Sequence, residues 1–166
     1  KVFDLRKKLN IKNNHKLIVY QGVIQKHRGV GQLIKIMSQS DGFSAIIIGD
    51  GEEKKYYKKL VKEYNVQDKV FFIGKIPYLH LFQYTLACDI GWLVIKGHGI
   101  SNQLALPNKL FEYAVAGLPI ISSSLRNMKN IVKKYNLGVI VNEDDIKGQL
   151  AALEDINKYD KKMKMD

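Results

Sequence analysis

Short apolar runs alternate with longer amphipathic segments along this chain. The continuous apolar runs predict buried strands at residues 16–20, 43–48, 70–73, 90–95, 118–122 and 139–141. Apolar positions at helical spacing predict helices over 30–37, 52–64, 79–87, 107–116, 127–135 and 144–153. Because the strands are apolar throughout, both faces of their sheet are expected to be covered. The predicted fold class is α/β: a Rossmann-like three-layer α/β/α sandwich with a parallel sheet of about six strands.

The ends of the chain differ from this regular pattern. Residues 1–15 resemble the end of an incoming helix followed by a polar linker, and residues 156–166 form a charged tail. The chain begins with Lys1 and not with methionine, so we expect it to be a piece of a longer protein. The domain itself is expected to span residues 16–155.

The stretch from 101 to 124 carries much of the candidate chemistry. Pro107 and Gly117 have the residue types that favour the start and end of a helix. Lys109 and Glu112 lie three residues apart, on one edge of that helix. Together with the polar loop 101–103, they could bind a ligand that has phosphates and hydroxyls. The alternative is an ordinary surface ion pair between Lys109 and Glu112. The inward stripe of the same helix is predicted to be Leu110, Phe111, Ala114 and Val115.

In a parallel sheet, ligands bind beyond the carboxyl ends of the strands. The loops expected there are 22–31, 49–51, 74–78, 96–107 and 122–126. The first follows a strand and opens a helix with the spacing Gly22-x6-Gly29-x-Gly31, which matches neither G-x-G-x-x-G nor a P-loop. Its amides and Arg28 could bind a diphosphate, although a solvated turn is the alternative.

Two side-chain placements follow from the second strand and the helix after it. Asp50 is expected to cap the next helix, with contact to a ribose as the alternative. In that helix Tyr56, Leu60 and Val61 are expected to face inward.

Composition narrows the possible functions. The 166 residues suit one domain. The net charge is +11, but only three of the 27 basic residues are arginine, and the lysines are dispersed, so attraction to an anionic membrane surface is favoured over nucleic acid. No apolar run is long enough to span a membrane. Cys88 is the only cysteine and is expected to be buried, and the four histidines lack metal-ligand spacing, so no metal site is predicted.

Four stretches in register resemble the C-terminal, donor-binding domain of family 4 retaining glycosyltransferases, which is one half of a GT-B fold. They are YQGVIQKHRGVGQLIKIM, IIIGDGEEKKYYKKLV, KVFFIGKIPYLHLFQYTLACDIGWL and PNKLFEYAVAGLPII, and they cover roughly residues 16 to 142. The resemblance implies a nucleotide-sugar donor, most often a UDP- or GDP-sugar, and hexosyl transfer with retention. It implies no cofactor and no catalytic metal.

The resemblance also assigns roles to individual residues. Arg28 would neutralise the diphosphate, Glu112 would hold the ribose hydroxyls, and Lys109 would help to stabilise the leaving group. Gly74, Lys75 and Ile76 would receive the nucleobase through their backbone, and Asp89 would be mainly structural. The implied binding set also includes three glycines and two polar residues, which are Gly22, Gly29, Gly49, Ser101 and Asn102.

Two positions depart from the family pattern. Leu104 stands where the first glutamate of Glu-x7-Glu would fall, and Val23 stands where an arginine would follow Gly22. The donor sugar is therefore expected to be held by Lys109 or the loop 101–103.

The resemblance implies an N-terminal acceptor domain that would bind a glycan or a lipid-linked acceptor, so the isolated chain is expected to be inactive in transfer. It also implies polysaccharide biosynthesis in the bacterial cytoplasm, with peripheral contact at the inner membrane face. A sugar-nucleotide epimerase, a phosphoacceptor domain and a non-catalytic binding module are the alternatives.

Overall fold

The sheet of this protein is the element that places the candidate site. The computed structural model describes residues 3–104 and 106–156, with the side chains of residues 101 and 102 left outside this description. Within these residues the sheet has six strands, β1 (Lys16–Gln21), β2 (Phe43–Ile48), β3 (Val70–Gly74), β4 (Ile90–Leu93), β5 (Ile120–Ser123) and β6 (Gly138–Val141). All neighbouring strands pair in parallel, in the order β3-β2-β1-β4-β5-β6. The predicted parallel six-stranded sheet is confirmed.

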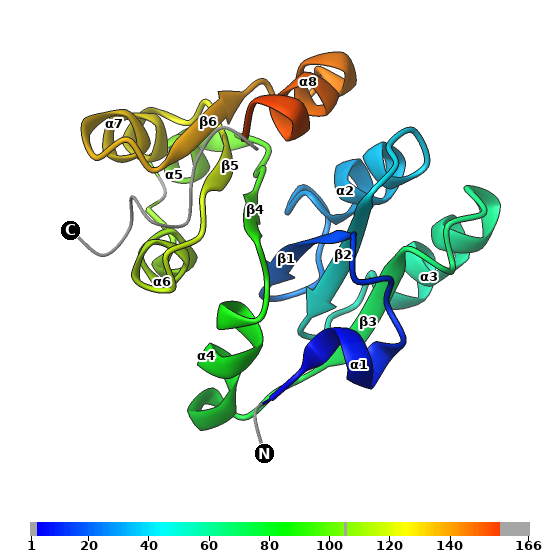
Figure 1. Cartoon of the computed structure of the whole chain (residues 1–166). Helices are drawn as coiled ribbons and strands as arrows, with labels where there is room; N and C mark the ends of the chain where they lie inside the picture. The colour runs from blue at the N-terminus through cyan, green and yellow to red at the C-terminus, as the bar shows by residue number, and fades with distance from the viewer. Residues whose placement is uncertain (1–2, 105, 157–166) are drawn as a thin grey trace.

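Helices cover both faces of the sheet (Figure 1). One face carries α2 (Val30–Met37), α3 (Lys54–Glu63) and α8 (Ile146–Ile156). The other carries α1 (Leu5–Leu9), α4 (Tyr78–Leu86), α6 (Asn108–Val115) and α7 (Arg126–Lys134). Successive residues of β1 alternate between the two cores, since Ile18 faces the α2 side and Val19 the α6 side. The three-layer prediction is therefore confirmed.

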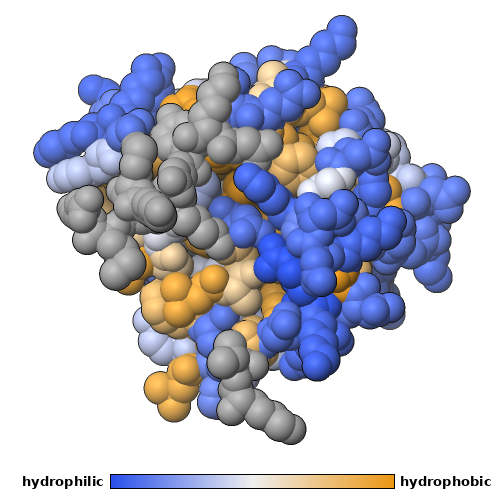
Figure 2. All heavy atoms as spheres, viewed as in Figure 1, coloured by the Kyte–Doolittle hydropathy of each residue, from blue (hydrophilic) through white to orange (hydrophobic). Residues whose placement is uncertain are grey.

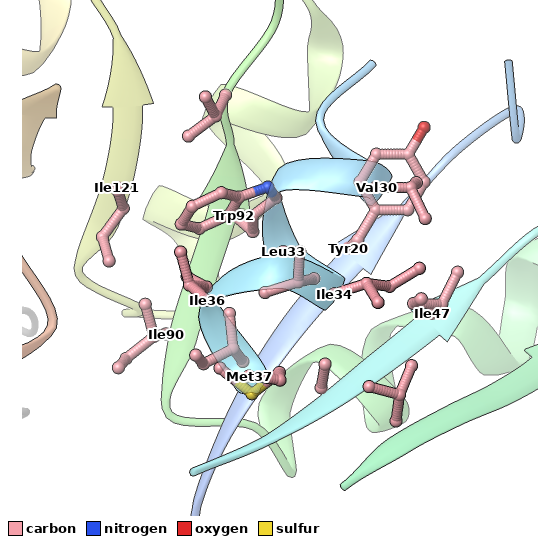
Figure 3. Close-up of a cluster of buried hydrophobic side chains, with 14 of the residues drawn as sticks. Tyr20, Val30, Leu33, Ile34, Ile36, Met37, Ile47, Ile90, Trp92 and Ile121 are labelled. Carbon is pink, nitrogen blue, oxygen red and sulfur yellow. The ribbon is translucent and has the colours of Figure 1, made fainter. Parts of the chain in front are cut away.

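The core on the α2 side is built around that helix. Figure 3 shows its buried side chains beside Tyr20, Ile47, Trp92 and Ile121, which belong to β1, β2, β4 and β5. Trp92 of β4 is fully buried there, and its Nε1 donates a hydrogen bond to the Gly29 carbonyl at 2.9 Å. Gly29 is the N-cap of α2 and has a φ of 91°, and a Cβ at that position would lie 2.2 Å from the Val94 carbonyl oxygen. The core thus fixes the start of α2, directly after Arg28.

The segment before β1 is more ordered than a linker. It contains the short helix α1, whose Leu5 is buried against the domain. Arg6 pairs with Asp89 at 2.5 Å, and the same Asp89 oxygen accepts a hydrogen bond from the Leu17 backbone N–H at 2.8 Å. Asp89 therefore has the structural role expected of it. Whether this segment leads from a further domain stays a prediction, as do the bounds of the domain and its tail.

Three local predictions were wrong. The loop 96–107 contains a short helix, α5 (Gly99–Gln103). In α3 Tyr57 is buried and Tyr56 is exposed, whereas Val61 is buried and Leu60 packs against the core as predicted. In α6 Phe111 and Val115 are exposed, whereas the side chains that point into the core are Leu110 and Tyr113.

Several of the exposed large apolar residues lie on α4 and α6. In Figure 2 most of the visible face is hydrophilic, and apolar atoms collect at the lower left, where Figure 1 places these two helices. The residues concerned are Tyr78, Leu79, Phe82, Leu86, Phe111 and Val115. Among the described residues, no helix combines the length and the apolar character that crossing a membrane requires.

Candidate functional site

The strand order reverses between β1 and β4, and the candidate site lies beside this point, where β1, β2 and β3 end. A cavity of about 420 Å³ opens there between the strand ends and the start of α6. Most of the predicted binding residues meet at this cavity. Its walls comprise Gln21, Gly22, Val23, Ile48, Gly49, Asp50, Lys75, Ile76, Leu81, Asn108, Lys109 and Glu112.

The floor of the cavity consists of closely packed backbone. The Gly22 N–H donates to the Ile48 carbonyl and the Gly49 N–H donates to the Gly74 carbonyl, both at 2.9 Å. A Cβ at Gly49, where φ is 135°, would lie 1.8 Å from the Gly22 carbonyl oxygen. Only glycine lets the two chain segments approach so closely. This contact explains why the glycines at the ends of neighbouring strands belong to one site.

The ammonium group of Lys109 lies over the Gly22 backbone. A Cβ at Gly22 would come within 2.5 Å of Lys109 Nζ. Burial lowers the pKa of Lys109, the nearby Glu112 carboxylate opposes this shift, and the positive charge of Arg28 adds to it. Lys109 and Glu112 share one edge of α6 as predicted, but these two described side chains form no ion pair within 4.0 Å. The alternative of a surface ion pair is therefore wrong, and both charged groups face the cavity.

Glu112 is held by a residue that the sequence analysis did not single out. Gln21 is the last residue of β1 and is only 2% exposed. Its Nε2 donates a hydrogen bond to Glu112 Oε2, and its Oε1 accepts one from Thr85 Oγ1 at 2.8 Å. A glutamine in an otherwise apolar strand was the available signal, because a buried amide needs partners.

The backbone of Gln21 is fixed as well. Its N–H donates to the Tyr113 hydroxyl at 3.1 Å, and that hydroxyl donates to the Val19 carbonyl at 3.2 Å. Burial raises the pKa of Tyr113 well above its ordinary value of 10.0, so the phenol remains protonated. Consecutive residues of α6, Glu112 and Tyr113, thus bind the side chain and the backbone of the same strand end.

Arg28 lies close enough to affect this site electrostatically, although it does not line the cavity. Its charge contributes to the lowered pKa of Lys109 and opposes the rise in the pKa of Tyr20. The adjacent His27 has a φ of 63°, and its ring lies 4.1 Å from that of His98. Three cationic side chains therefore lie near the strand ends: Lys109 and Lys75 line the cavity, and Arg28 lies outside it.

Asp50 has a different role from the predicted helix cap. The residue at the N-cap of α3 is Glu53, whereas Asp50 accepts a hydrogen bond from the Gly51 N–H at 2.9 Å and pairs with Lys54 at 3.6 Å. The Gly51 hydrogen bond and then Lys54 lower the pKa of Asp50. The alternative, contact with a ribose, stays a prediction, and Asp50 lines the cavity.

Other predicted residues lie at or beyond the edge of the cavity. Gly74 contributes its carbonyl to the floor, and Gly29 lies behind the wall at the start of α2. Ser101 and Asn102 belong to α5, and their side chains lie outside the described part of the structure.

A larger hollow of about 760 Å³ lies on the other face of the sheet, beside α2, α3 and α8. It contains none of the predicted donor-binding residues. Two ion pairs on its walls, Lys26–Glu53 at 3.9 Å and Lys96–Asp144 at 2.7 Å, neutralise their own charges. The smaller cavity contains a partly desolvated lysine, Lys109, and is the better candidate. In the described residues, no group of three or more His, Cys, Asp or Glu side chains could hold a metal ion.

Comparison with known proteins identifies this architecture. A family model described as "Glycosyl transferases group 1" matches residues 2–165. No curated protein matches the chain.

Solved structures share the fold. Sucrose-phosphate synthase from Thermosynechococcus elongatus is 22% identical with a TM-score of 0.77, and the alignment covers 96% of this chain and 40% of that one. Anabaena Alr3699/HepE in complex with UDP and glucose is 19% identical with a TM-score of 0.76, covering 93% and 41%. The C-terminal domain of a glycosyl transferase group 1 family protein (LpcC) from Francisella tularensis is 17% identical with a TM-score of 0.72, covering 95% and 82%. The chain thus spans about 40% of the first two proteins and most of the isolated C-terminal domain.

Proposed function

Because this chain belongs to the glycosyl transferases group 1 family, we propose that it is the donor-binding half of an enzyme that transfers a sugar from a nucleotide-sugar to an acceptor. The expected donor is a UDP- or GDP-sugar, and the reaction retains the configuration of the anomeric carbon without a metal. The single observation that carries the proposal is the 420 Å³ cavity, where a partly buried lysine and a fixed carboxylate meet at the strand ends.

The chemistry of the cavity suits a nucleoside diphosphate. A diphosphate needs cations and backbone N–H groups, and Lys109, Arg28 and the start of α2 supply them. A ribose needs acceptors for its two hydroxyls, which the Glu112 carboxylate provides. The base would reach the backbone at Lys75 and Ile76. That HepE was solved with UDP and glucose supports this choice of ligand class.

The same cations would assist the transfer step. When the glycosidic bond to the diphosphate breaks, negative charge gathers on the departing phosphate oxygen. Lys109 and Arg28 lie beside the strand ends before the reaction begins, and a positive charge that is already in place stabilises a developing anion with little reorganisation. Lys109 is partly desolvated, which strengthens its interaction with that anion.

The acceptor is proposed to be a glycan or a lipid-linked sugar bound by an N-terminal domain, with a hexose as the transferred group. The net charge of +11 supports peripheral contact of this bacterial, cytoplasmic enzyme with the inner membrane face, in a pathway of polysaccharide biosynthesis.

Calorimetric titration of the chain with UDP, GDP and ADP tests the proposal. We expect one of these nucleotides to bind, with no sugar transfer by the chain alone, because the acceptor half of the active site is absent. Failure of all three to bind would contradict the donor-site assignment. Robust sugar transfer by the chain alone would contradict the proposal that a separate N-terminal domain binds the acceptor.

Binding is expected to persist in an excess of chelator. The positive charge that the diphosphate needs comes from Lys109 and Arg28, and a metal would compete with them for the phosphate oxygens. The same titration, repeated with EDTA and then with added magnesium, provides the measurement. A tenfold loss of affinity in EDTA, about 1.4 kcal/mol, would count against metal independence.

The affinity for UDP is expected to fall at alkaline pH. The pKa of Lys109 lies below its ordinary value of 10.5, so the ammonium loses its proton earlier than an exposed lysine does. A diphosphate binds the protonated form, and affinity should therefore start to decrease at a lower pH than for a lysine that titrates at 10.5. Lys109→Arg keeps its charge at alkaline pH and is the matched control. Parallel pH profiles for the two proteins would show that Lys109 does not contact the phosphates.

A further inference from the structure

A buried side-chain amide connects α4 to α6 beneath the cavity. Gln21 and Thr85 are 2% and 1% exposed, so their polar groups must find partners within the protein. The amide of Gln21 forms one hydrogen bond with the Thr85 hydroxyl and one with the Glu112 carboxylate. Thr85 belongs to the wall of a neighbouring hollow and does not line the 420 Å³ cavity.

The orientation of this amide follows from the chemistry of its neighbours. A carboxylate can only accept hydrogen bonds, so the NH2 group of Gln21 must point toward Glu112. The amide oxygen then faces Thr85, whose hydroxyl can donate to it. The opposite orientation would place the amide oxygen against the charged oxygens of Glu112. The Thr85 hydroxyl lies 2.8 Å from this amide oxygen and 3.2 Å from the Leu81 carbonyl, so donation to the nearer acceptor favours the orientation of Gln21 that supports an ionised Glu112.

Glu112 is also restricted by the bond it receives. One of its oxygens, Oε2, is occupied by Gln21. The carboxylate cannot rotate without breaking that bond, and Oε1 and the remaining lone pairs are left for a ligand in the cavity that Glu112 lines. The backbone of Gln21 is itself bound by Tyr113, so both the side chain and the backbone of Gln21 are tied to α6.

We propose that Gln21, oriented by Thr85, is a positioning residue that fixes the Glu112 carboxylate for the two ribose hydroxyls of the donor nucleotide. This inference rests on the proposed function. It predicts that Thr85, which lies outside the cavity, controls the part of the binding energy that the ribose hydroxyls contribute and leaves the phosphate contacts unchanged.

The test compares a nucleoside diphosphate with its 2′,3′-dideoxy form, which lacks both hydroxyls. UDP is used, or whichever of GDP and ADP binds the parent chain, with the matching dideoxy compound. Thr85→Val keeps the volume of the side chain but removes its hydroxyl. We expect this variant to lose about three- to fivefold in affinity for the ribonucleotide, as for one weakened hydrogen bond, and less than about twofold for the dideoxy compound.

Two further variants separate positioning from stability. Thr85→Ser retains the hydroxyl and is expected to restore the preference for the ribonucleotide. Ser44→Ala removes another buried hydroxyl, which contacts His15 at the opposite end of the sheet, and should leave the preference unchanged.

If Thr85→Val does not fold, Gln21→Glu provides a second test. It places a second carboxylate against Glu112, and at about pH 8 the two negative charges repel each other, so ribonucleotide affinity should be low. Affinity should recover at about pH 5, where the two carboxylates share a proton. The dideoxy compound should show a much weaker pH dependence.

Equal losses for both ligands in Thr85→Val, or a pH-independent Gln21→Glu, would overturn the positioning role and leave the proposed function intact. Failure of the parent chain to bind any of the three nucleotides would overturn the proposed function itself, and this inference with it.

Discussion

Trp92→Ala is expected to lower the free energy of unfolding by about 3–5 kcal/mol, as replacing a large buried aromatic residue with alanine typically does. Trp92 is fully buried, and its indole ring packs between the sheet and α2 (Figure 3). Native domains have total stabilities of about 5–15 kcal/mol, so a large part of the folded population could be lost at elevated temperature. Trp92 is the only tryptophan, and urea unfolding must therefore be followed by circular dichroism.

Trp92→Phe distinguishes packing from the hydrogen bond. Phenylalanine fills much of the same space but cannot donate to the Gly29 carbonyl, and an unsatisfied buried acceptor costs about 1–3 kcal/mol. Because Gly29 follows Arg28 directly, this variant is also expected to weaken nucleotide binding while it remains folded.

The matched control is Ile36→Val, toward the other end of α2. It should cost about 0.5–1.5 kcal/mol and leave nucleotide affinity unchanged. If Trp92→Phe is as stable as the parent, the hydrogen bond to Gly29 does not support the start of α2.

The fold was predictable because its signals are local. Six continuous apolar runs, each bounded by glycine or polar residues, indicate buried parallel strands. The segments between these runs carry apolar residues at helical spacing, which indicates helices and not loops. The predicted phase of α3 and of α6 was partly wrong. Tyr56 and Tyr57 are the same residue type, so hydrophobicity cannot decide which of the two is buried. In α6 the more hydrophobic ring, Phe111, is exposed, whereas Tyr113 is buried because its hydroxyl finds hydrogen-bond partners on β1.

The site was predictable only in part. The glycines at strand ends follow from the strand pattern, and parallel strands bring them to one edge. Lys109 and Glu112 follow from their spacing on one helix. Thr85 and Gln21, in contrast, are 64 residues apart in the chain, and Gln21 is 91 residues from Glu112. No local pattern in the sequence predicts these contacts, because they depend on how α4 and α6 pack against β1.

Glu112→Ala and Arg28→Ala are each expected to weaken nucleotide binding by about tenfold or more, but for different ligands. Hydrogen bonds to a charged group contribute about 1.5–3 kcal/mol each. Loss of Glu112 should affect nucleoside monophosphates and diphosphates alike, since both carry the ribose. Loss of Arg28 should affect the diphosphate far more, and its effect should shrink at high salt because the charge is near the surface. Titration of UMP and UDP at low and high salt measures both patterns.

The two variants also differ in what they do to the fold. Arg28 lies in a loop, and its removal should barely change stability. Glu112→Ala leaves the buried Nε2 of Gln21 without its acceptor, which should destabilise the domain by about 1–3 kcal/mol. Glu112→Gln retains an acceptor and the shape of the side chain, and Arg28→Lys retains the charge but loses the paired donors. Glu112→Gln is therefore the matched control for the stability of the fold, and Arg28→Lys is the matched control for the geometry of the phosphate contact.

A specific result would separate the structural role of Glu112 from its proposed binding role. If Glu112→Ala remains folded and binds UMP and UDP as the parent does, the carboxylate serves only the amide of Gln21, and the ribose assignment is wrong. If instead Glu112→Gln is as stable as the parent but still binds both nucleotides weakly, the negative charge is needed by the ligand and not by the fold. We expect the second outcome, because Gln21 occupies only Oε2 and the carboxylate lines the cavity.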